Sequence, residues 1–563
     1  MKTNNYSLYK MLFGLCLLGL QTQSVAQIKD SIIDNSVVDV VKTFKPILSD
    51  AIKIPIQPNP DKPETKKPVY IYDLDVQTVQ IAPNIYTIKP LSLGTSLLPK
   101  LKNNYSKIGF GNYNSPLVEF YLNTVRNKQM RAGIFYKHIS ANGNENENET
   151  NFSNNTLHGN FNYFKSNQRY TVDAYYHRNR VQLYGRPDSF EFNADQGKIV
   201  YNLIDVKAGA SNTPKDSASF SHQTQVHYYS YSNQAKQQEN NLGIYTTLTK
   251  SFEQLPVALQ AGFRMNQYDS AGTAYNRRFF YLNPEIKLEE NNYYLKAGFN
   301  TFFETDSTDS KGYFFPKAEA GFQIIPKMFE VFGGLTGNVQ VNTFRSITTE
   351  NPFIQNPIQS NTVHKLELYG GFKGQLSPQC GFHIQSSSSQ LENNLYFIYR
   401  AQDSLKLTDP SAGSQIAVYD GTKGTLTQLQ IHVYYQKGEK WRINMSTFIN
   451  NYKMDKLTDA FGRAEFESKL NIWYNIADKI YTKFDLFYIG ERAFGSNTIS
   501  NLTPVKRGLM NAYTDVNLGF EYRYKKHIST FLQLNNLTNN NYQRWAAYTN
   551  YRFNLMAGFT FTF

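Results

Sequence analysis

The last thirteen residues of the chain, 551–563, alternate almost perfectly between two kinds of side chain. A β-strand points successive side chains to opposite faces, so this segment is predicted to be a strand with one apolar and one mostly polar face. Similar alternation recurs from about residue 105 onward. Together with an export signal, described below, it predicts a transmembrane antiparallel β-barrel with lipid outside and a polar lumen inside. The apolar face of the last segment comprises Tyr551, Phe553, Leu555, Ala557, Phe559, Phe561 and Phe563.

Five further segments keep their charged residues on one face only. A charge that faces lipid at mid-depth costs about 2–4 kcal/mol, so the uncharged faces are expected to point outward. At roughly 20 residues per strand and connection, residues 105–563 predict about 22 strands, within a range of about 18–24. The predicted outward faces are Leu295, Ala297, Phe299 and Phe303; Leu429, Ile431, Val433 and Tyr435; Trp441, Ile443, Met445 and Ile449; Phe484, Leu486 and Tyr488; and Val516, Leu518, Phe520, Tyr522 and Tyr524.

The predicted connections between strands are of two lengths. Residues 165–168 and 289–291 fit short turns, whereas 141–156, 343–364 and 401–422 fit long loops. The stretch 141–156 is polar and almost free of apolar residues, so we expect it to be a solvated loop. Short turns that alternate with long loops are typical of a barrel with a periplasmic end and an extracellular end.

Residues 1–26 have the features of a secretory signal peptide. Two lysines precede an apolar run over 11–20, and Ser24-Val25-Ala26 provides the small residues of a cleavage site before Gln27. The apolar run is too short to span a bilayer as a helix, which needs about 20 residues. The sequence therefore predicts export to the cell outer membrane.

The two cysteines offer no disulfide after cleavage. Cys16 lies in the signal peptide, and Leu15 occupies the position where a lipidation site needs a small residue, so we do not expect a lipoprotein. Cys380 then remains alone, which excludes an intramolecular disulfide and a cysteine metal site. We expect Cys380 to be a small apolar residue near the start of a strand.

Composition supports the barrel and argues against other classes. The mean hydropathy is −0.50 and no later segment has 18 consecutive apolar residues, which excludes a helical membrane protein. The 41 tyrosines and 40 phenylalanines suit aromatic girdles at the two bilayer interfaces. The net charge of +13 falls to +11 without Lys2 and Lys10, and the bases are scattered. They therefore predict contact with anionic lipid headgroups rather than with nucleic acid.

Residues 27–104 differ from the rest of the chain. Proline is frequent there and alternates with Lys and Asp, so we expect an extended, semi-rigid segment in the periplasm or the lumen. Before it, Val37, Val38, Val40 and Val41 form a β-prone run that could add as a strand to a periplasmic partner protein. An ordinary tethered tail is the alternative. The prolines are Pro46, Pro55, Pro58, Pro60, Pro63 and Pro68.

The end of the chain resembles the end of the barrel in TonB-dependent receptors. The resemblance rests on 531–537, on the N-L-x-N-x-x-Y stretch over 536–542, on Tyr548 and on the aromatic close over 557–563. It implies an outer-membrane barrel. It also implies that the last aromatic residues, Phe559, Phe561 and Phe563, belong to the signal that the barrel assembly machinery reads.

The start of the chain is similar to short receptor-like barrels of Bacteroidota. This similarity rests on 41–46 and 109–113 and on three-residue matches to the O-glycosylation sequon of that phylum, such as Asp216-Ser217-Ala218. The receptor family places a plug of roughly 130 residues before the barrel, whereas 27–104 is shorter and rich in proline. The resemblance therefore implies a receptor-like barrel without the standard plug.

No catalytic motif stands out in the sequence. It contains no G-x-S-x-G, H-E-x-x-H or P-loop pattern. His177, His227 and His432 lie in different predicted strands and are expected to be lumenal polar residues rather than metal ligands. Pairs such as Lys483 with Asp485 and Glu521 with Arg523 are expected to balance charge inside the barrel. The sequence thus predicts no enzyme, no metal site and no cofactor.

Two functions remain open at this point. The first is a structural or accessory subunit of an outer-membrane complex for protein insertion, secretion or surface assembly, with surface lipoproteins or periplasmic proteins as partners. The absence of a recognisable plug favours this reading. The alternative is a transporter or channel for nutrient uptake, whose lumen is closed by the N-terminal segment or by loops. A hydrolase at the barrel rim is the least favoured reading.

Overall fold

The structure is a computed structural model that describes most of the chain from Asn104 to Phe563. The predicted signal peptide 1–26, with Cys16, lies outside the described residues. So do residues 27–103 and the candidate docking residues Val37, Val38, Val40 and Val41. Within 104–563, the ranges left undescribed are 125–126, 144–149, 186–196, 215–218, 253–254, 271, 307, 355–356, 401–413 and 498–504.

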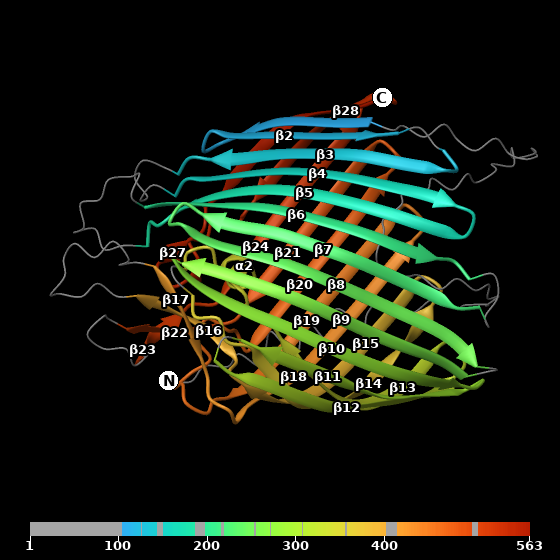
Figure 1. Ribbon diagram of the computed structural model, residues 1–563. Helices are drawn as coiled ribbons and strands as arrows, with labels where there is room; N and C mark the ends of the chain where they lie inside the picture. Colours follow the sequence, from blue (N-terminus) through green and yellow to red (C-terminus); the bar gives the residue numbers. More distant parts are fainter. Residues whose placement is uncertain are drawn as a thin grey trace, which may run out of the picture. The chain divides into compact units, whose positions relative to one another are not determined.

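The described residues form a closed antiparallel β-barrel of 22 strands, as the sequence predicted (Figure 1). Each strand pairs with the next barrel strand in the chain, and β1 pairs with both β2 and β28, which closes the ring. The barrel strands are β1 (Asn104–Gly111), β2 (Ser115–Asn123), β3 (Met130–Ala141), β4 (Phe152–Lys165), β5 (Gln168–Gln182), β6 (Lys198–Asn212), β7 (Ser221–Asn233), β8 (Gln237–Phe252), β9 (Leu255–Ser270), β10 (Thr273–Glu289), β11 (Tyr293–Thr305), β12 (Ser310–Ile325), β13 (Phe329–Gln340), β14 (Thr362–Ser377), β15 (Cys380–Glu392), β18 (Gly424–Lys437), β19 (Trp441–Lys453), β20 (Phe466–Ile476), β21 (Ile480–Ile489), β24 (Tyr513–Arg523), β25 (Ile528–Asn535) and β28 (Asn554–Thr562).

The two faces of the last strand are those that its alternation predicted. On β28, Phe559 is 68% exposed on the outer face, whereas Met556 is 4% exposed on the lumen face. The strand is shorter than predicted, because it begins at Asn554. Tyr551 and Phe553 belong to the preceding loop: the Tyr551 ring packs against that of Tyr113. The Phe553 N–H donates to a loop side chain, Asn539 Oδ1 (3.1 Å).

The connections at one end of the barrel are short, and those at the other end are long. The short end, here called the turn end, holds both ends of the described chain, because Asn104 N–H donates to Phe563 O (3.1 Å). The turns predicted at 165–168 and 289–291 lie there, and the structure places these connections at 166–167 and 290–292. The opposite loop end is at the left of Figure 1. Long loops face the cell exterior in outer-membrane barrels, so the loop end is the extracellular one.

One predicted loop is shorter than expected. The stretch 141–156 was predicted to be solvated throughout, but β3 extends to Ala141 and β4 begins at Phe152. The polar residues at the start of β4 pair across the sheet: Asn155 Oδ1 lies 2.7 Å from His138 Nδ1. Cross-strand hydrogen bonds of this kind allow a polar sequence to remain in strand conformation beyond the bilayer.

The barrel closes at a place where only glycine fits. Gly558 on β28 lies opposite Gly109 on β1, and the ring of Phe531 packs over both from the lumen side. A Cβ atom on Gly558 would lie 2.0 Å from the backbone oxygen of Ile108. The two glycines therefore allow the first and last strands to approach closely.

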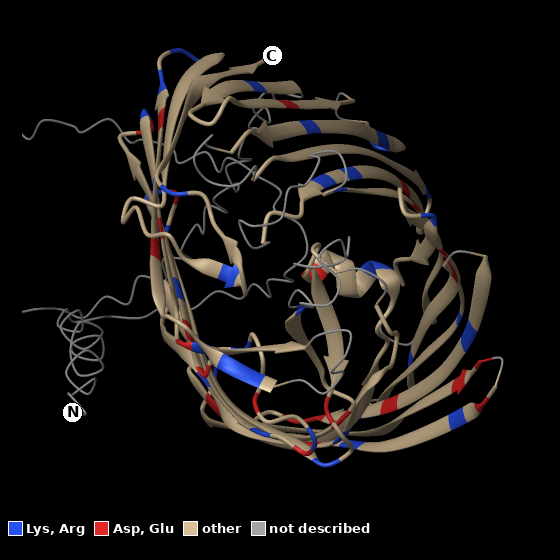
Figure 2. Ribbon diagram, turned by 90° about the vertical axis from the view of Figure 1, so that its left-hand side faces the viewer, with Lys and Arg blue, Asp and Glu red and all other residues tan. Residues whose placement is uncertain are grey.

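The lumen wall carries paired charges, as the sequence predicted. Lys483 Nζ lies 2.6 Å from Asp485 Oδ2, and Arg523 Nε lies 3.6 Å from Glu521 Oε1. Figure 2 shows charges of both signs distributed around the ring. The lumen wall is therefore polar and carries charges of both signs.

The loop end also contains secondary structure that does not belong to the barrel ring. A four-stranded sheet joins two long connections, β15–β18 and β21–β24, and a short hairpin and one helix, α2 (Phe344–Glu350), occupy others. In the view into this end, the helix and the short strands lie inside the outline of the ring (Figure 2). The short strands are β16 (Leu395–Arg400), β17 (Gln415–Tyr419), β22 (Arg492–Asn497), β23 (Val505–Met510), β26 (Gln543–Trp545) and β27 (Tyr548–Thr549).

Among the described residues, no helix is both long and apolar enough to cross a membrane.

Candidate functional site

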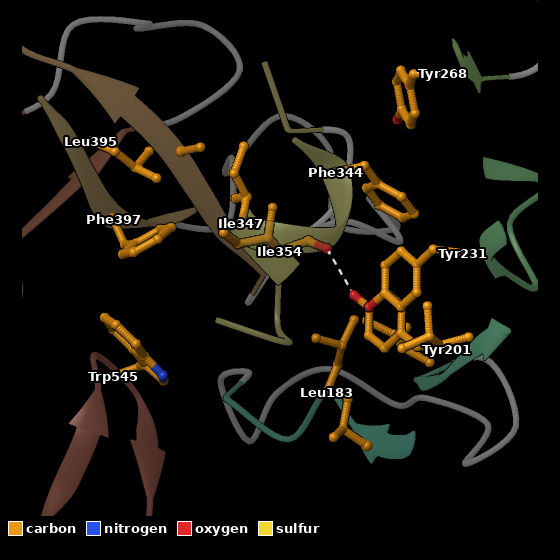
Figure 3. Close-up of a cluster of buried hydrophobic side chains, with 14 of the residues drawn as sticks. Leu183, Tyr201, Tyr231, Tyr268, Phe344, Ile347, Ile354, Leu395, Phe397 and Trp545 are labelled. Atoms are coloured by element: carbon orange, nitrogen blue, oxygen red, sulfur yellow. Dashed lines mark hydrogen bonds between the residues drawn. The ribbon is translucent and has the colours of Figure 1, made fainter. Parts of the chain in front are cut away.

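The long connections fold inward and form an apolar cluster with the inner wall of the barrel, which we call the loop core (Figure 3). The wall contributes lumen-facing residues of β5, β6, β7 and β9. The loops contribute residues of the β13–β14, β15–β18 and β25–β28 connections. The loop core comprises Val181, Leu183, Ile199, Tyr201, Leu203, Tyr229, Tyr231, Tyr268, Phe344, Ile347, Ile354, Leu395, Phe397, Ala417, Trp545 and Tyr548.

Helix α2 carries the most deeply buried part of the loop core. Phe344 and Ile347 lie three residues apart, so they project from one face of the helix, and both are fully buried. The Phe344 ring packs against Tyr201, Tyr231 and Tyr268 on the wall, at centroid distances of 6.3, 5.2 and 5.3 Å. A short helix gains its stability from such packing rather than from its own propensity.

The sequence of this connection also fixes where the helix begins. Thr343 is its N-cap: the Thr343 Oγ1 accepts from the N–H of Ser346 (3.1 Å). In return, the Ser346 Oγ accepts from the N–H of Thr343 (2.8 Å). This reciprocal capping box satisfies two backbone donors that the first turn would otherwise leave unpaired. The helix is therefore defined locally before it meets the wall.

Two carboxylates of the wall hold the start of α2. Glu239, which is fully buried, accepts from the Phe344 N–H (2.6 Å) and from the Tyr229 hydroxyl (2.5 Å). Asp205 Oδ2 lies 2.7 Å from Arg345 Nη1, and Asp205 Oδ1 lies 2.9 Å from His227 Nε2. Charge-assisted hydrogen bonds of this kind are about twice as strong as neutral ones. They fix α2 to β6, β7 and β8.

Arg277 on β10 binds both ends of the β13–β14 connection, residues 341–361. Its guanidinium donates to the backbone oxygen of Asn342 (2.9 Å) and to the side-chain oxygen of Asn361. It also forms an ion pair with Glu304 (2.8 Å), whose other oxygen accepts from Asn361 (2.7 Å). Arg277 is only 2% exposed. One buried side chain thus holds the two points where the connection leaves and re-enters the barrel.

Other loops are fixed to this connection in turn. Tyr419 at the end of β17 donates to Ile358 O (2.7 Å), and Arg463 of the β19–β20 loop pairs with Glu350 at the end of α2 (2.8 Å). The ring of Phe353 stacks on Tyr548 of β27 with centroids 3.7 Å apart. The three connections of the loop core and the β19–β20 loop are therefore fixed to one another, and the β13–β14 connection lies at their centre.

Asp420 joins two of these loops. It is 4% exposed and accepts from the backbone N–H groups of Lys456 (2.8 Å), Leu457 (3.0 Å) and Asp455. Burial disfavours the carboxylate, but these N–H groups outweigh it and hold the pKa of Asp420 below its usual value. Asp420 therefore remains charged in the loop at any pH above about 4.

We expect Asp420→Ala to weaken the junction between these loops by about 1.5–3 kcal/mol, because it removes hydrogen bonds to a charged group. The lowered pKa fixes the sign of the pH dependence: this stabilisation is complete above about pH 3.9, the unfolded value, and is lost as the pH falls through the lower folded pKa. Hydrogen exchange of the 455–457 amides measures both effects. Asp459→Ala is the matched control, since among the described residues the Asp459 carboxylate pairs with the exposed Lys506; equal exchange in both variants would contradict the prediction.

The histidines that the sequence singled out lie on the lumen wall, but the structure does not bring them together. His227 bonds Asp205, His177 lies 3.0 Å from Thr156 Oγ1, and His432 lies 3.0 Å from Ser446 Oγ. In the part of the chain that the structure describes, no group of three or more His, Cys, Asp or Glu residues could hold a metal ion. Cys380 is the first residue of β15, near the predicted strand start.

The sequence predicted the barrel but not the loop core. The segment 343–364 was expected only to be long, yet it contains Phe344, Ile347 and Ile354, each of which is at most 1% exposed. Apolar residues inside a stretch that is otherwise too polar for a strand are the signal that could have predicted an inward fold. Phe559, Phe561 and Phe563 do lie on the outer face of the barrel, and their role as an assembly signal stays a prediction.

No protein-family model and no curated protein matches the chain. Its fold is nevertheless similar to solved outer-membrane receptors. The ferric-catecholate import receptor Fiu of Escherichia coli K12 matches with a TM-score of 0.60 and 10% identity over 82% of each chain. The ferripyoverdine receptor of Pseudomonas aeruginosa matches with a TM-score of 0.61 and 13% identity, over 82% of this chain and 72% of that one. The FrpB iron transporter of Neisseria meningitidis matches with a TM-score of 0.63 and 8% identity over 83% of each.

The described residues therefore have the barrel fold of these solved outer-membrane receptors. At identities of 8–13% the similarity establishes the fold alone. A closed antiparallel barrel of 22 strands with an apolar outer face is an outer-membrane protein, because a lipid bilayer requires every backbone polar group to be paired within the protein.

Proposed function

We propose that this protein is an outer-membrane transporter for nutrient uptake, with a lumen that the loop core closes at its extracellular end. The observation that carries the proposal is the inward fold of the β13–β14 connection, which Arg277, Glu239 and Asp205 hold against the lumen wall. A barrel of 22 strands is wide enough for an aqueous channel. The loop core lies at the extracellular end of the lumen and binds the lumen wall through a few buried polar contacts. These are the properties of a gate.

The structural neighbours support import over the accessory role that the sequence favoured. Their names describe an import receptor, a ferripyoverdine receptor and an iron transporter, and none describes an assembly subunit. The accessory role has no support from these comparisons. The relation to Bacteroidota receptors and a barrel without the standard plug remain parts of the proposal, since they rest on the sequence alone.

The energetics of the loop core suit a gate rather than a permanent plug. Its apolar contacts are extensive, but its attachment to the wall depends on the ion pairs of Arg345 and Arg277 and on the hydrogen bonds of Glu239. Polar contacts can exchange for water when a loop moves outward, at a net cost of about 1.5–3 kcal/mol for each hydrogen bond to a charged group. A binding event that disturbs several of them could therefore shift the loop core.

Growth of a deletion strain tests the proposal. We expect deletion of the gene in the native organism to impair growth on at least one limiting nutrient supplied as a ferric chelate, vitamin, peptide or glycan, and the wild-type gene to restore it. Outer-membrane protein levels should stay unchanged. Normal growth on every nutrient, together with loss of other outer-membrane proteins, would instead establish the accessory role.

A further inference from the structure

A small polar cavity lies at the loop end, between the lumen wall and the last residues of the β13–β14 connection. Its volume is about 100 Å³. Lys311 and Tyr313 of β12 line it from the wall side, and Gln359 lines it from the connection. A water molecule needs about 10–15 Å³ by this measure, so the cavity has room for several waters or for one small solute.

The three acidic groups that line this cavity already have partners. For Asp309, Oδ1 accepts from the N–H of Ser310 (2.8 Å) and Oδ2 lies 3.8 Å from Lys311 Nζ. Glu304 is bound by Arg277 and Asn361, as described above. Asp306 accepts from the Tyr275 hydroxyl (2.8 Å) and from the N–H groups of Thr308 and Asp309 (2.7 Å each). The Thr308 N–H in particular holds the pKa of Asp306 below its usual range. These carboxylates are satisfied within the protein and offer little to a cation.

Three polar groups on the cavity are not satisfied in this way. Lys311 Nζ forms an exposed ion pair with Asp309 Oδ2 at 3.8 Å, a distance too long for a hydrogen bond, so its N–H donors are not used by that carboxylate. The Tyr313 hydroxyl forms no hydrogen bond to the described residues. The side-chain amide of Gln359 is buried, and neither its nitrogen nor its oxygen has a partner there. A buried donor or acceptor without a partner is costly, so an occupant that pairs with the Gln359 amide would be stabilised there.

The unpaired groups define the chemistry of that occupant. The Gln359 amide has one free acceptor and a free donor group, and a second amide satisfies both because it presents a carbonyl beside an N–H. The Lys311 ammonium is a cation with exchangeable donors, and its natural partner is a carboxylate. A single small molecule that carries both an amide and a carboxylate would meet both needs, and the Tyr313 hydroxyl could donate to either group.

We propose that this cavity binds the acylamino-carboxylate group –CO–NH–CHR–COO⁻, as found in N-acylated amino acids and at the C-terminus of peptides. Gln359 pairs with its amide and Lys311 with its carboxylate. Because Lys311 belongs to the wall and Gln359 to the β13–β14 connection, the bound group links the two and holds the connection in place. The site does not depend on the proposed function, since binding can be measured without transport.

Calorimetric titration of the full-length protein in detergent tests the chemistry. N-acetylglycine is the probe, with acetate and N-methylacetamide as probes that carry only one of its two groups. We expect saturable binding of N-acetylglycine and at least about tenfold weaker binding of either half. Tetraglycine distinguishes the two sources of the group, a peptide C-terminus and a free N-acyl amino acid. An affinity equal to that of N-acetylglycine means that a peptide C-terminus suffices, and no binding means that only free N-acyl amino acids fit. Absence of saturable N-acetylglycine binding, or equal binding of acetate, would overturn the proposal.

Two variants test the residues independently. We expect Lys311→Met and Gln359→Leu each to weaken N-acetylglycine binding at least about tenfold. Lys311 has an exposed side chain, so its replacement should leave folding unchanged. Lys423→Met is the matched control, because Lys423 is an exposed loop lysine that does not line the cavity. Wild-type affinity in both cavity variants would contradict the assignment.

Discussion

We expect Arg277→Met to release the β13–β14 connection from the lumen wall while the barrel itself stays folded. The variant removes the donors that reach Asn342 and Asn361, and it leaves the carboxylate of Glu304 buried without its cation. Breaking a buried ion pair by removing one partner costs about 3–5 kcal/mol. Limited proteolysis of the protein in detergent should show new cleavage within 341–361, at a rate at least about 100-fold above wild type.

The neighbouring residue provides the control for this experiment. Arg278 follows Arg277 on β10 but points to the outer face, where its side chain is exposed. Arg278→Met removes the same charge from the same strand and should leave proteolysis of the connection unchanged. If Arg277→Met remained as resistant as Arg278→Met, the apolar contacts of Phe344 and Ile347 alone would hold the connection, and the role given to Arg277 would be wrong.

We expect Gly558→Val to prevent closure of the barrel. A Cβ atom at this position would lie 2.0 Å from Ile108 O and 2.6 Å from the Cα of Gly109, so the backbone of β1 must move. Overpacking against movable side chains costs about 1–3 kcal/mol, and displacing a paired backbone costs more because hydrogen bonds of the ladder are lost as well. The folded, heat-modifiable form should be absent on electrophoresis after purification from membranes.

Ala557→Val is the matched control for the closing strand. Ala557 is the preceding residue of β28 and lies on the lipid-facing side with Phe559. A larger apolar side chain there should leave the folded form intact, because it meets lipid rather than backbone. Equal amounts of folded barrel in the two variants would show that β1 and β28 tolerate a wider spacing than the structure has.

The barrel could be predicted from the sequence because its physical constraint is uniform along the chain. Every strand must present uncharged residues to lipid, so alternation such as that of Phe484, Leu486 and Tyr488 against Lys483 and Asp485 sets the inward and outward faces. Strand number followed from length alone, since each strand and connection uses a similar number of residues. These regularities are local, and a single sequence is enough to detect them.

The loop core could not be predicted in the same way, because it depends on contacts between distant segments. Phe344 packs on Tyr268, and Trp545 packs on Phe397 with ring centroids 5.1 Å apart. No periodic pattern connects such residues. The role of Arg277 could not be predicted from the sequence either. In the sequence Arg277 is one of two adjacent arginines, and only the pairing of β9, β10 and β11 shows which of them faces the lumen. The candidate site is therefore a property of the tertiary structure.

Single-channel conductance in planar bilayers tests the central claim most directly, namely that the loop core closes the extracellular end of the lumen. The wild-type protein, Arg277→Met and Arg278→Met are compared under the same voltage and salt. The account predicts a closed wild type and a closed Arg278→Met, with frequent openings in Arg277→Met. A wild type that conducts continuously as a wide pore would contradict it.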